Sequence, residues 1–356
     1  GVLISHAHRE MRGLAEKAQI PVVTTLLGIS SLPTDHYLNL GMAGMHGLAH
    51  ASLAIDKADL LISLGMRFDD RVTGRLRDFA PNAKVVHVDI DPSELDKNVK
   101  ADGPVAGDLK QVLNQLLPKI EPNVHIEWLR HTDKLRADHP STQIRDTQEL
   151  LPQYVLTELS KATRGEALIV TGVGQHQMWA AQYCDFQEPN TLITSGGLGT
   201  MGFEVPAALG AKLGRPDKTV WSVAGDGGFQ MTMCDLATAV ENKVDIKFAI
   251  LNNGRLGMVH QLQDLSYNEE HFATVYSGNP DFVKLAAAYG ITGIRVTEKE
   301  KVAEAIQQAM ETPGPVIVDF MIRETENVYP WIPAGESVNE ILEETAQQTG
   351  PGEKGS

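Results

Sequence analysis

The stretch Thr219–Gly228, TVWSVAGDGG, decides the fold of this 356-residue chain. Its largely apolar first part is typical of a buried strand, and the Gly-Asp-Gly-Gly that follows is typical of a turn into a helix. A helical pattern over Gln230–Glu241 and a second apolar run over Asp245–Leu251, which two asparagines follow, complete a strand–helix–strand unit. We therefore predict parallel strands whose carboxyl ends carry Asp226 and Asn253, 27 residues apart.

The residue types at these two strand ends favour a magnesium–diphosphate site. Asp226 and Asn253 offer hard oxygen ligands suited to Mg²⁺, an ion that usually binds phosphates of a ligand as well. Gly225, Gly227 and Gly228 let a diphosphate approach the backbone, next to the N-terminus of the following helix. A Gly-Asp-Gly sequence alone is a common turn, and the strand, helix and asparagine at this spacing are what favour a cofactor site.

Two further segments fit a bound cofactor. The segment 172–177, GVGQHQ, follows a predicted strand and opens a helix, an arrangement that suits a phosphate. The segment 195–202, SGGLGTMG, has five glycines or serines in eight residues, so it is either a long turn or a site where backbone touches a ligand. Met201 within it is either a core residue or a wedge beneath a bent cofactor.

The composition excludes several classes of protein. The chain has 31 Lys and Arg against 46 Asp and Glu, a net charge of −15, so neither nucleic acid nor an anionic membrane is expected as a partner. No apolar run approaches the roughly 20 residues of a membrane span. Cys184 and Cys234 form no metal or redox motif and are expected to be reduced thiols, with the cytoplasm as the default location. An organellar location stays open.

Short apolar runs alternate with helical patterns almost throughout, which predicts an α/β fold of two three-layer domains with mainly parallel sheets. We expect a first domain over residues 1–120, a linker over 121–150, a second domain over 151–335 and a C-terminal tail over 336–356. The expected strands are residues 20–25, 60–65, 83–90, 167–171, 219–224, 246–252 and 316–321.

The motifs resemble those of a known enzyme family. The stretches GVGQHQMWAAQ, SGGLGTMGF, GDGGFQMTM and LNNGRLGMVHQ are similar to the thiamine diphosphate (ThDP) domain of acetohydroxyacid synthase (acetolactate synthase) catalytic subunits. Upstream, GMHG at 44–47 and RFDDRVTG at 67–74 are similar to the Rossmann-like, FAD-binding middle domain of that family. The resemblance implies ThDP, Mg²⁺ and FAD as cofactors, with the FAD domain at 1–120 and the ThDP fold at 151–335.

The resemblance also implies roles for individual residues. The expected metal ligands are Asp226, Asn253 and the carbonyl of Arg255. The residues expected to contact ThDP are Val173, Gly174, Gln175, His176, Gly199, Met201, Gly225, Asp226, Gly227, Gly228, Met231 and Asn253. The residues expected to act in catalysis are Gln175, Met201, Met258 and Val259. The residues expected to contact FAD are Thr25, Leu26, Met45, His46, Gly65, Arg67, Asp70, Arg71, Asp89, Ile90 and Asp108.

Some of the FAD assignments have independent support in the residues. Asp89 ends a predicted strand, where an acidic side chain commonly binds ribose hydroxyls. Arg67 and Arg71 follow a strand end and could both reach a pyrophosphate. The alternative is that they pair with Asp69 and Asp70 on a solvated turn.

The implied reaction is decarboxylation of pyruvate and ligation to a second 2-keto acid, which gives 2-acetolactate or, from 2-ketobutyrate, 2-aceto-2-hydroxybutyrate in branched-chain amino acid biosynthesis. The resemblance implies a homodimer or tetramer and a small regulatory subunit. The alternatives are a non-catalytic ThDP- or FAD-binding fragment, a related carboligase, or a flavin-dependent pyruvate oxidase.

Three departures from the family pattern limit the implied activity. The chain starts inside the FAD domain, so we expect a fragment without the pyrimidine-binding domain and its activating glutamate, inactive in isolation. Leu262 stands where anabolic members usually carry Trp, which predicts a weaker preference for 2-ketobutyrate. Trp331 stands where methionine is common.

Overall fold

The computed structural model describes residues 1–344, which form two compact units. The first unit comprises residues 1–25, 38–143 and the segment from 329 onward; the second comprises 26–37 and 144–328. The division at 143 falls within the predicted linker, and the segment 26–37 belongs with the second unit although it lies early in the chain. The domain boundaries expected from the sequence stay predictions.

The first unit is built on parallel strands, as expected. A three-stranded sheet has the order β3-β4-β5, and a separate parallel pair joins β1 to β2. The strands are β1 (Val22–Thr24), β2 (Asn39–Met42), β3 (Leu60–Leu64), β4 (Lys84–Asp89) and β5 (Gly103–Ala106). The helices are α1 (His8–Ala18), α2 (Ala49–Lys57), α3 (Asp70–Thr73), α4 (Leu109–Leu116) and α5 (Ile126–Asp138). The predicted strands at 20–25, 60–65 and 83–90 are confirmed to within two residues at each end.

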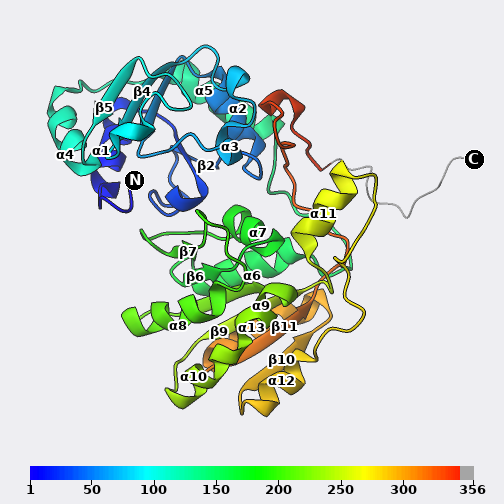
Figure 1. Cartoon of the computed structure of the whole chain (residues 1–356). Helices are drawn as coiled ribbons and strands as arrows, with labels where there is room; N and C mark the ends of the chain where they lie inside the picture. The colour runs from blue at the N-terminus through cyan, green and yellow to red at the C-terminus, as the bar shows by residue number, and fades with distance from the viewer. Residues whose placement is uncertain (345–356) are drawn as a thin grey trace, which may run out of the picture. The chain divides into compact units, whose positions relative to one another are not determined.

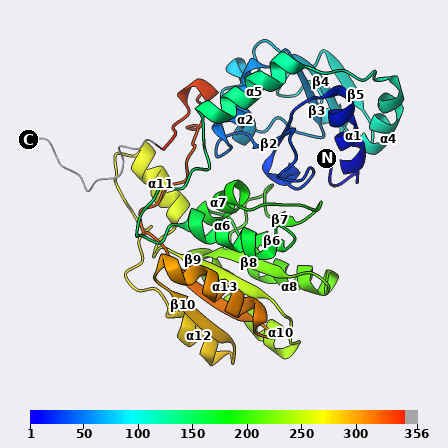
Figure 2. The same ribbon diagram turned by 180° about the vertical axis from the view of Figure 1, so that it is seen from behind.

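Helix α5 lies in the segment 121–150, which the sequence predicts to be a linker. Its Trp128 and Leu135 pack against a cluster of buried side chains that includes Leu40, Ala51 and Ala54. Figure 2 shows α5 alongside α2. The helix is therefore a packed part of the first unit.

The second unit is a six-stranded, wholly parallel sheet of order β10-β11-β9-β8-β6-β7. The strands are β6 (Leu168–Thr171), β7 (Leu192–Thr194), β8 (Val220–Gly225), β9 (Lys247–Asn252), β10 (Thr292–Val296) and β11 (Val316–Met321). The chain adds β7 on one side of β6 and then returns to place β8 on the other side. This reversal makes the carboxyl ends of β6 and β8 a topological switch point, where open α/β sheets bind their ligands.

Helices cover both faces of this sheet, so the unit has three layers. One face carries α6 (Pro152–Thr163), α7 (Gln175–Tyr183) and α13 (Val302–Glu311), with α6 and α13 side by side in Figure 2. The other face, toward the viewer in Figure 1, carries α8 (Glu204–Gly214), α9 (Asp226–Thr232), α10 (Leu236–Glu241) and α12 (Phe282–Ala288). The remaining helix, α11 (Gly257–Ser266), follows β9.

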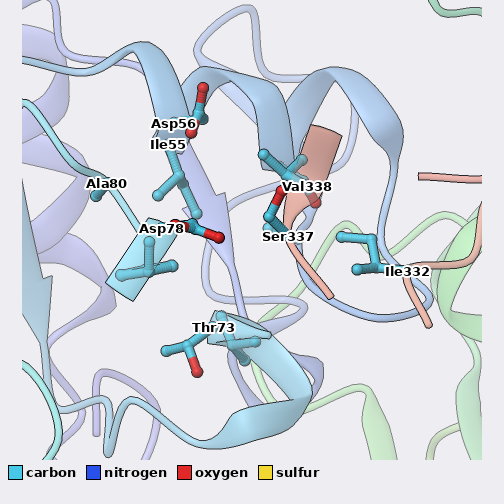
Figure 3. Close-up of a pocket in the computed structure, with 12 residues that line it drawn as sticks. Ile55, Asp56, Thr73, Asp78, Ala80, Ile332, Ser337 and Val338 are labelled. Carbon is cyan, nitrogen blue, oxygen red and sulfur yellow. The ribbon is translucent and has the colours of Figure 1, made fainter. Parts of the chain in front are cut away.

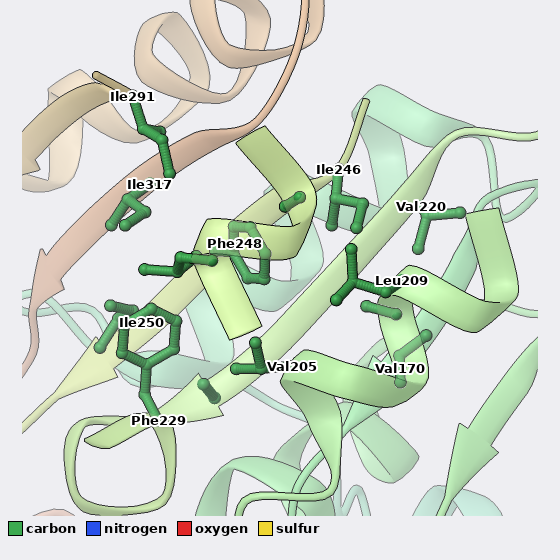
Figure 4. Close-up of a cluster of buried hydrophobic side chains, with 14 of the residues drawn as sticks. Val170, Val205, Leu209, Val220, Phe229, Ile246, Phe248, Ile250, Ile291 and Ile317 are labelled. Atoms are coloured by element: carbon green, nitrogen blue, oxygen red, sulfur yellow. The ribbon is translucent and has the colours of Figure 1, made fainter. Parts of the chain in front are cut away.

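The core of the second unit lies between the sheet and α8, α9, α10 and α12 (Figure 4). Phe229, the fourth residue of α9, is fully buried there. Its ring meets Phe248 of β9 and Phe282 of α12 edge to face, at centroid distances of 5.9 and 5.7 Å. This packing holds the first turn of α9, with Asp226, against the end of the sheet.

Two features of the second unit differ from the sequence-based prediction. Strands β7 and β10 are not among the strands expected from the sequence. They lie at the two edges of the sheet and lack the buried apolar pattern of central strands, and no residue of β7 is fully buried. The helix expected over 230–241 begins at Asp226 and is interrupted after Thr232. The hydroxyl of Thr232 donates to the Gly202 carbonyl at 2.7 Å, a contact outside the helix.

Within residues 1–344, no helix combines the length and the apolar character that crossing a bilayer requires.

We expect Phe229→Ala to lower the free energy of unfolding by about 3–5 kcal/mol, because it removes a fully buried ring and leaves a cavity. Phe272→Ala is the matched control, since that ring is 83% exposed and its loss should change stability by about 0.5 kcal/mol or less. Urea denaturation followed by far-UV circular dichroism measures both. Equal losses in the two variants would contradict the packing described for α9.

Candidate functional site

Three adjacent strands of the second unit, β6, β8 and β9, end at the same edge of the sheet. Strand β6 leads through the segment 172–174 into α7, which begins at Gln175. Strand β8 leads directly into α9, which begins at Asp226, and β9 is followed by Asn253. The structure thus brings together the side chains that the sequence predicted for one site, and the Asn253 amide lies 3.4 Å from Oε1 of Gln175.

Asp226 is buried with only one of its carboxylate oxygens satisfied. Its Oδ2 accepts hydrogen bonds from the Gly254 N–H at 2.9 Å and from Nδ2 of Asn279 at 2.7 Å. Its Oδ1 is buried without a partner among the described residues. Burial raises the pKa of Asp226 to about 6, against the opposing effect of these donors. A buried oxygen that lacks a donor is the group a cation would satisfy.

Asn279 is a residue of this site that sequence reasoning missed. Its Nδ2 donates both to Asp226 and to Oδ1 of Asn252, the second bond at 2.9 Å. Its own Oδ1 accepts from Nε2 of Gln230 at 3.0 Å, which fixes the direction of the amide. In the sequence Asn279 stands in a Gly-Asn-Pro turn, and nothing in that pattern indicates a contact with a strand end 53 residues earlier.

A buried amide network fixes Gln175 at the start of α7. Its Nε2 donates to Oε1 of Gln261 at 2.9 Å and to the Glu326 carbonyl at 2.8 Å. Gln261 in turn exchanges two hydrogen bonds with the backbone of Val328. The predicted catalytic residue Gln175 therefore has both amide hydrogens committed to protein acceptors, and its Oε1 faces Asn253.

The segment 195–202 is an extended turn whose residues are half-buried or exposed up to Met201, whereas Gly202 is buried; Met201 lies outside the hydrophobic core. Gly199 has φ +67°, in the left-handed region that favours glycine. A Cβ at Gly202 would lie 3.0 Å from Cβ of Met231, so the turn packs closely against α9. Met201 and Met231, both predicted to contact ThDP, thus come from neighbouring segments, and Met231 is 53% exposed.

His176 and Glu204 carry further buried polar atoms without a hydrogen-bond partner among residues 1–344. His176 is buried, its Nε2 has no partner within residues 1–344, and burial lowers its pKa to about 3. Glu204, the first residue of α8, is fully buried, and neither of its carboxyl oxygens has a hydrogen-bond partner there. Burial raises the pKa of Glu204 to about 7. A helix N-terminus stabilises a carboxylate by about 0.3–1 kcal/mol, less than the several kcal/mol that burying an unpaired charge costs, so the acid form is favoured.

Helix α11 carries Met258 and Val259, which are expected from the resemblance to act in catalysis. Met258 is half-buried, and Val259 is 44% exposed. Leu262, which stands where the family usually has Trp, is also 44% exposed. The side chain of Arg255 points elsewhere, with Nη1 2.5 Å from Nε2 of His260 and Nη2 donating to Glu324 at 2.9 Å. A metal-binding role of the Arg255 carbonyl stays a prediction.

His260, Asp264 and His271 form the one group of side chains within residues 1–344 with the spacing of metal ligands. His260 Nδ1 lies 3.3 Å from Asp264, His271 also pairs with Asp264, and the two imidazoles stack at 4.0 Å. Arg255 donates to Nε2 of His260, which leaves the ring proton on Nδ1 facing Asp264. That tautomer has no lone pair on Nδ1 for a metal, so the group is better described as hydrogen bonds between two histidines and a shared carboxylate.

In the first unit, the loop 44–47 and the turn at 67–74 meet. The Met45 N–H donates to the Arg71 carbonyl at 2.8 Å. Gly44 has φ +103°, and a Cβ there would lie 2.9 Å from Cα of Val72, so only glycine allows this approach. Burial lowers the pKa of His46 to about 4, which keeps this imidazole neutral. The predicted FAD contacts Met45, His46 and Arg71 are therefore neighbours.

Arg67 and Arg71 pair with the aspartates beside them. Arg67 bonds to Asp69 and Arg71 to Asp70, each at 2.8 Å, on an exposed turn. This is the solvated pairing that the sequence left open as an alternative. Exposed pairs of this kind contribute about 0–1 kcal/mol, so an anionic ligand could replace the aspartates at little cost.

The other predicted FAD residues are spread over the strand ends. Gly65 follows β3 with φ +68°, Asp89 ends β4 and is buried, and Ile90 after it is 72% exposed. Oδ1 of Asp108 accepts from the Gln111 N–H at 3.0 Å and caps α4. Thr25 belongs to the first unit and Leu26 to the second, and a flavin role for either stays a prediction.

The first unit also contains a partly open pocket of about 20 Å³, room for one water molecule (Figure 3). The polar residues that line it are Ser52, Asp56, Thr73, Asp78 and Ser337. Trp331, in the segment that brings Ser337 here, is buried and pairs its backbone with Leu342. None of the residues predicted to bind a cofactor lines this pocket, which fits one water molecule between the C-terminal segment and the rest of the unit.

Comparison with known proteins identifies both units. Residues 1–116 match the family described as thiamine pyrophosphate enzyme, central domain, and residues 172–320 match the thiamine pyrophosphate enzyme, C-terminal TPP binding domain. The chain is 47% identical over 352 residues to the acetolactate synthase large subunit of Corynebacterium glutamicum. It is 46% identical over 353 residues to acetolactate synthase of Mycobacterium leprae, and 42% identical over 347 residues to the chloroplastic acetolactate synthase 1 of Zea mays.

These alignments cover 96% of this chain for both bacterial relatives and 94% for the maize protein. They cover 56% of each bacterial relative and 54% of the maize protein. The chain thus spans a little over half the length of the curated relatives that it matches.

We expect Glu204→Gln to stabilise the ligand-free protein at pH 8. Because the folded-state pKa of about 7 exceeds the ordinary value of 4.5, wild-type stability falls as the pH rises between these values and stays low above them. The glutamine variant lacks this loss and should gain up to roughly 3 kcal/mol at pH 8, and almost none at pH 4. Chemical denaturation at the two pH values measures it, with the exposed Glu241→Gln as a control for charge. Equal stability of wild type and Glu204→Gln at pH 8 would contradict a buried, unpaired acid.

Proposed function

This chain belongs to the acetolactate synthase large-subunit family of thiamine pyrophosphate enzymes, and from that premise we propose that it carries the cofactor site for joining two 2-keto acids. In the proposed reaction pyruvate loses CO₂, and its remaining two carbons are joined to the keto carbon of a second 2-keto acid. A second pyruvate gives 2-acetolactate, and 2-ketobutyrate gives 2-aceto-2-hydroxybutyrate.

The observation that carries the proposal is the half-satisfied carboxylate of Asp226. Two donors hold its Oδ2, while Oδ1 is buried without a partner at the switch point of a parallel sheet. Asn253 lies at the end of the adjacent strand, with Oδ1 accepting from the Arg255 N–H at 3.2 Å. These oxygens fit a small hard cation such as Mg²⁺, with the Arg255 carbonyl as a third candidate ligand.

The surrounding backbone fits the diphosphate of thiamine diphosphate. Gly227 and Gly228 lie in the first turn of α9, and the residues 172–174 before α7 supply a second stretch of closely approachable backbone. When bound, thiamine diphosphate supplies the electron sink that decarboxylation and carbon–carbon bond formation require. The residues of this chain hold the cation, position the diphosphate and, through Met201 and Met231, offer apolar contacts to the ring system.

We propose FAD as the ligand of the first unit. Arg67 and Arg71 would exchange their aspartate partners for the pyrophosphate of the flavin nucleotide, and the neutral His46 would lie beside it. Asp89, at the carboxyl end of β4, is placed to accept from ribose hydroxyls. By extension from the family, we propose a homodimer or tetramer with a small regulatory subunit.

We expect Asp226→Ala to abolish Mg²⁺-dependent binding of thiamine diphosphate and Asn279→Ala to weaken it about tenfold. The first removes a metal ligand; the second removes one of the two donors to Asp226 Oδ2, so the carboxylate is held less firmly with Oδ1 toward the cation. Isothermal titration of thiamine diphosphate with Mg²⁺ present measures both, with Asp235→Ala, in the turn after α9, as the control. Assays of acetolactate formation from pyruvate on the same preparations test the reaction. Unchanged binding by Asp226→Ala would refute the metal assignment.

We expect Arg71→Gln to weaken FAD binding about tenfold, because it removes a donor pair for the pyrophosphate at a position whose ion pair adds little to stability. Arg130→Gln is the matched control, since Arg130 forms an equally exposed pair with Glu127 on α5, away from the flavin residues. Titration followed by flavin fluorescence measures both affinities. Equal losses in the two variants would indicate a general effect of charge and contradict the assignment.

A further inference from the structure

Glu204 has no role in the site as predicted from the sequence, and its surroundings are unusual for an acid. It is fully buried at the start of α8, and neither oxygen has a hydrogen-bond partner among residues 1–344. Buried acids of this protein are otherwise bonded: Asp319 accepts from Arg295 and Asn252, and Glu326 from Arg145 and Gln153. A fully buried acid without a hydrogen-bond partner in the protein suggests that a ligand supplies the partner.

Two glycines make the room for this carboxyl group, and both belong to the proposed diphosphate site. A Cβ at Gly172 would overlap Oε2 of Glu204, and a Cβ at Gly228 would lie 3.1 Å from Oε1. Gly172 begins the segment that leads into α7, and Gly228 lies in the first turn of α9. The carboxyl group therefore lies between the two stretches of backbone proposed to receive the diphosphate.

A second unpartnered atom reaches the same place. The position of a Cβ on Gly172 lies 2.9 Å from Nε2 of His176, an atom that is also buried without a partner. Because His176 is neutral, it cannot neutralise a carboxylate beside it. The space between Gly172 and Gly228, which the carboxyl group of Glu204 occupies, is called the gap below. Asp226, whose Oδ1 is also unpaired, lies two residues before Gly228 in the first turn of α9.

The charge of a diphosphate decides which protonation state of Glu204 could bind it. A carboxylate would repel an anionic diphosphate at close range, whereas a carboxylic acid offers one O–H donor and an acceptor. A donor in a buried site binds an ionised oxygen more strongly than it binds a neutral one. We propose that Glu204 is a further diphosphate-binding residue of this chain, which donates the proton of its carboxyl group in a hydrogen bond to a phosphate oxygen. This inference rests on the proposed function.

The test uses Mg²⁺ with inorganic pyrophosphate as the probe, because pyrophosphate reports on the diphosphate site without the ring system. Isothermal titration at pH 7 compares wild type, Glu204→Gln, Glu204→Ala and the exposed control Glu241→Gln. Glutamine keeps a donor of similar length, so Glu204→Gln should bind within about threefold of wild type. Alanine removes the donor and should weaken binding at least tenfold, the loss expected for one hydrogen bond to a charged group. Equal or tighter binding by Glu204→Ala would overturn the proposal and indicate a residue that merely fills the gap.

A pH series keeps the test decisive if Glu204→Ala does not fold. The acid must be protonated to donate, so wild-type affinity relative to that of Glu204→Gln should fall between pH 7 and pH 9. The other titratable groups near the gap are His176 on α7, Asp226 on α9 and Tyr276, whose hydroxyl lies against Gly227. They are present in both proteins, so their effects cancel in the ratio. A ratio that does not change with pH would overturn the proposal. Failure of wild type to bind both pyrophosphate and thiamine diphosphate would refute the proposed function, and Glu204 with it.

Discussion

Parallel pairing of β6 with β8 and of β8 with β9 is the constraint on which the site depends. Because all three strands run the same way, the residues that follow them must lie at one edge of the sheet, whatever their separation in the chain. The chain reverses its direction of winding at β6, so no crossover covers that edge between β6 and β8. The helices α7 and α9 then start there, with their backbone N–H groups toward the same gap.

Some polar atoms at this edge of the sheet are hydrogen-bonded to the protein, and others have no partner among the described residues. Asn279 and the Gly254 N–H donate to Oδ2 of Asp226. Nε2 of Gln175 donates to the Gln261 side chain and to the Glu326 carbonyl. Each of these bonds fixes an orientation, because the donors and acceptors are themselves bonded to backbone or to another amide. Oδ1 of Asp226, Nε2 of His176 and both carboxyl oxygens of Glu204 remain unpaired among the described residues. Such an arrangement keeps its geometry without a ligand, at the cost of a few unsatisfied buried atoms.

The sequence predicts this edge of the sheet well, because the information is local. The run ending in GDGG, the following helix and the asparagine after β9 form one strand–helix–strand unit, and its spacing determines which side chains meet. Asn279 and Glu204 could not be found in this way. Asn279 reaches Asp226 across 53 residues, and Glu204 contacts glycines 32 residues before it and 24 after it, distances over which no local pattern exists. The edge strands β7 and β10 were missed for a different reason, since partial exposure removes the apolar signal on which strand prediction relies.

The two units would bind the proposed anionic ligands by different physical routes. In the first, Arg67 and Arg71 keep solvent-exposed aspartate partners, and exchanging one weak, hydrated ion pair for a bidentate contact with phosphate costs little. In the second, the acidic groups are buried, and burial raises the pKa of both Asp226 and Glu204 instead of pairing them with a base. A cation beside Asp226 would remove the reason for its raised pKa, whereas an anion beside Glu204 would strengthen it. Asp226 would therefore ionise and Glu204 would stay protonated when a metal–diphosphate pair binds. Two acids of similar burial could thus bind the two oppositely charged parts of one ligand.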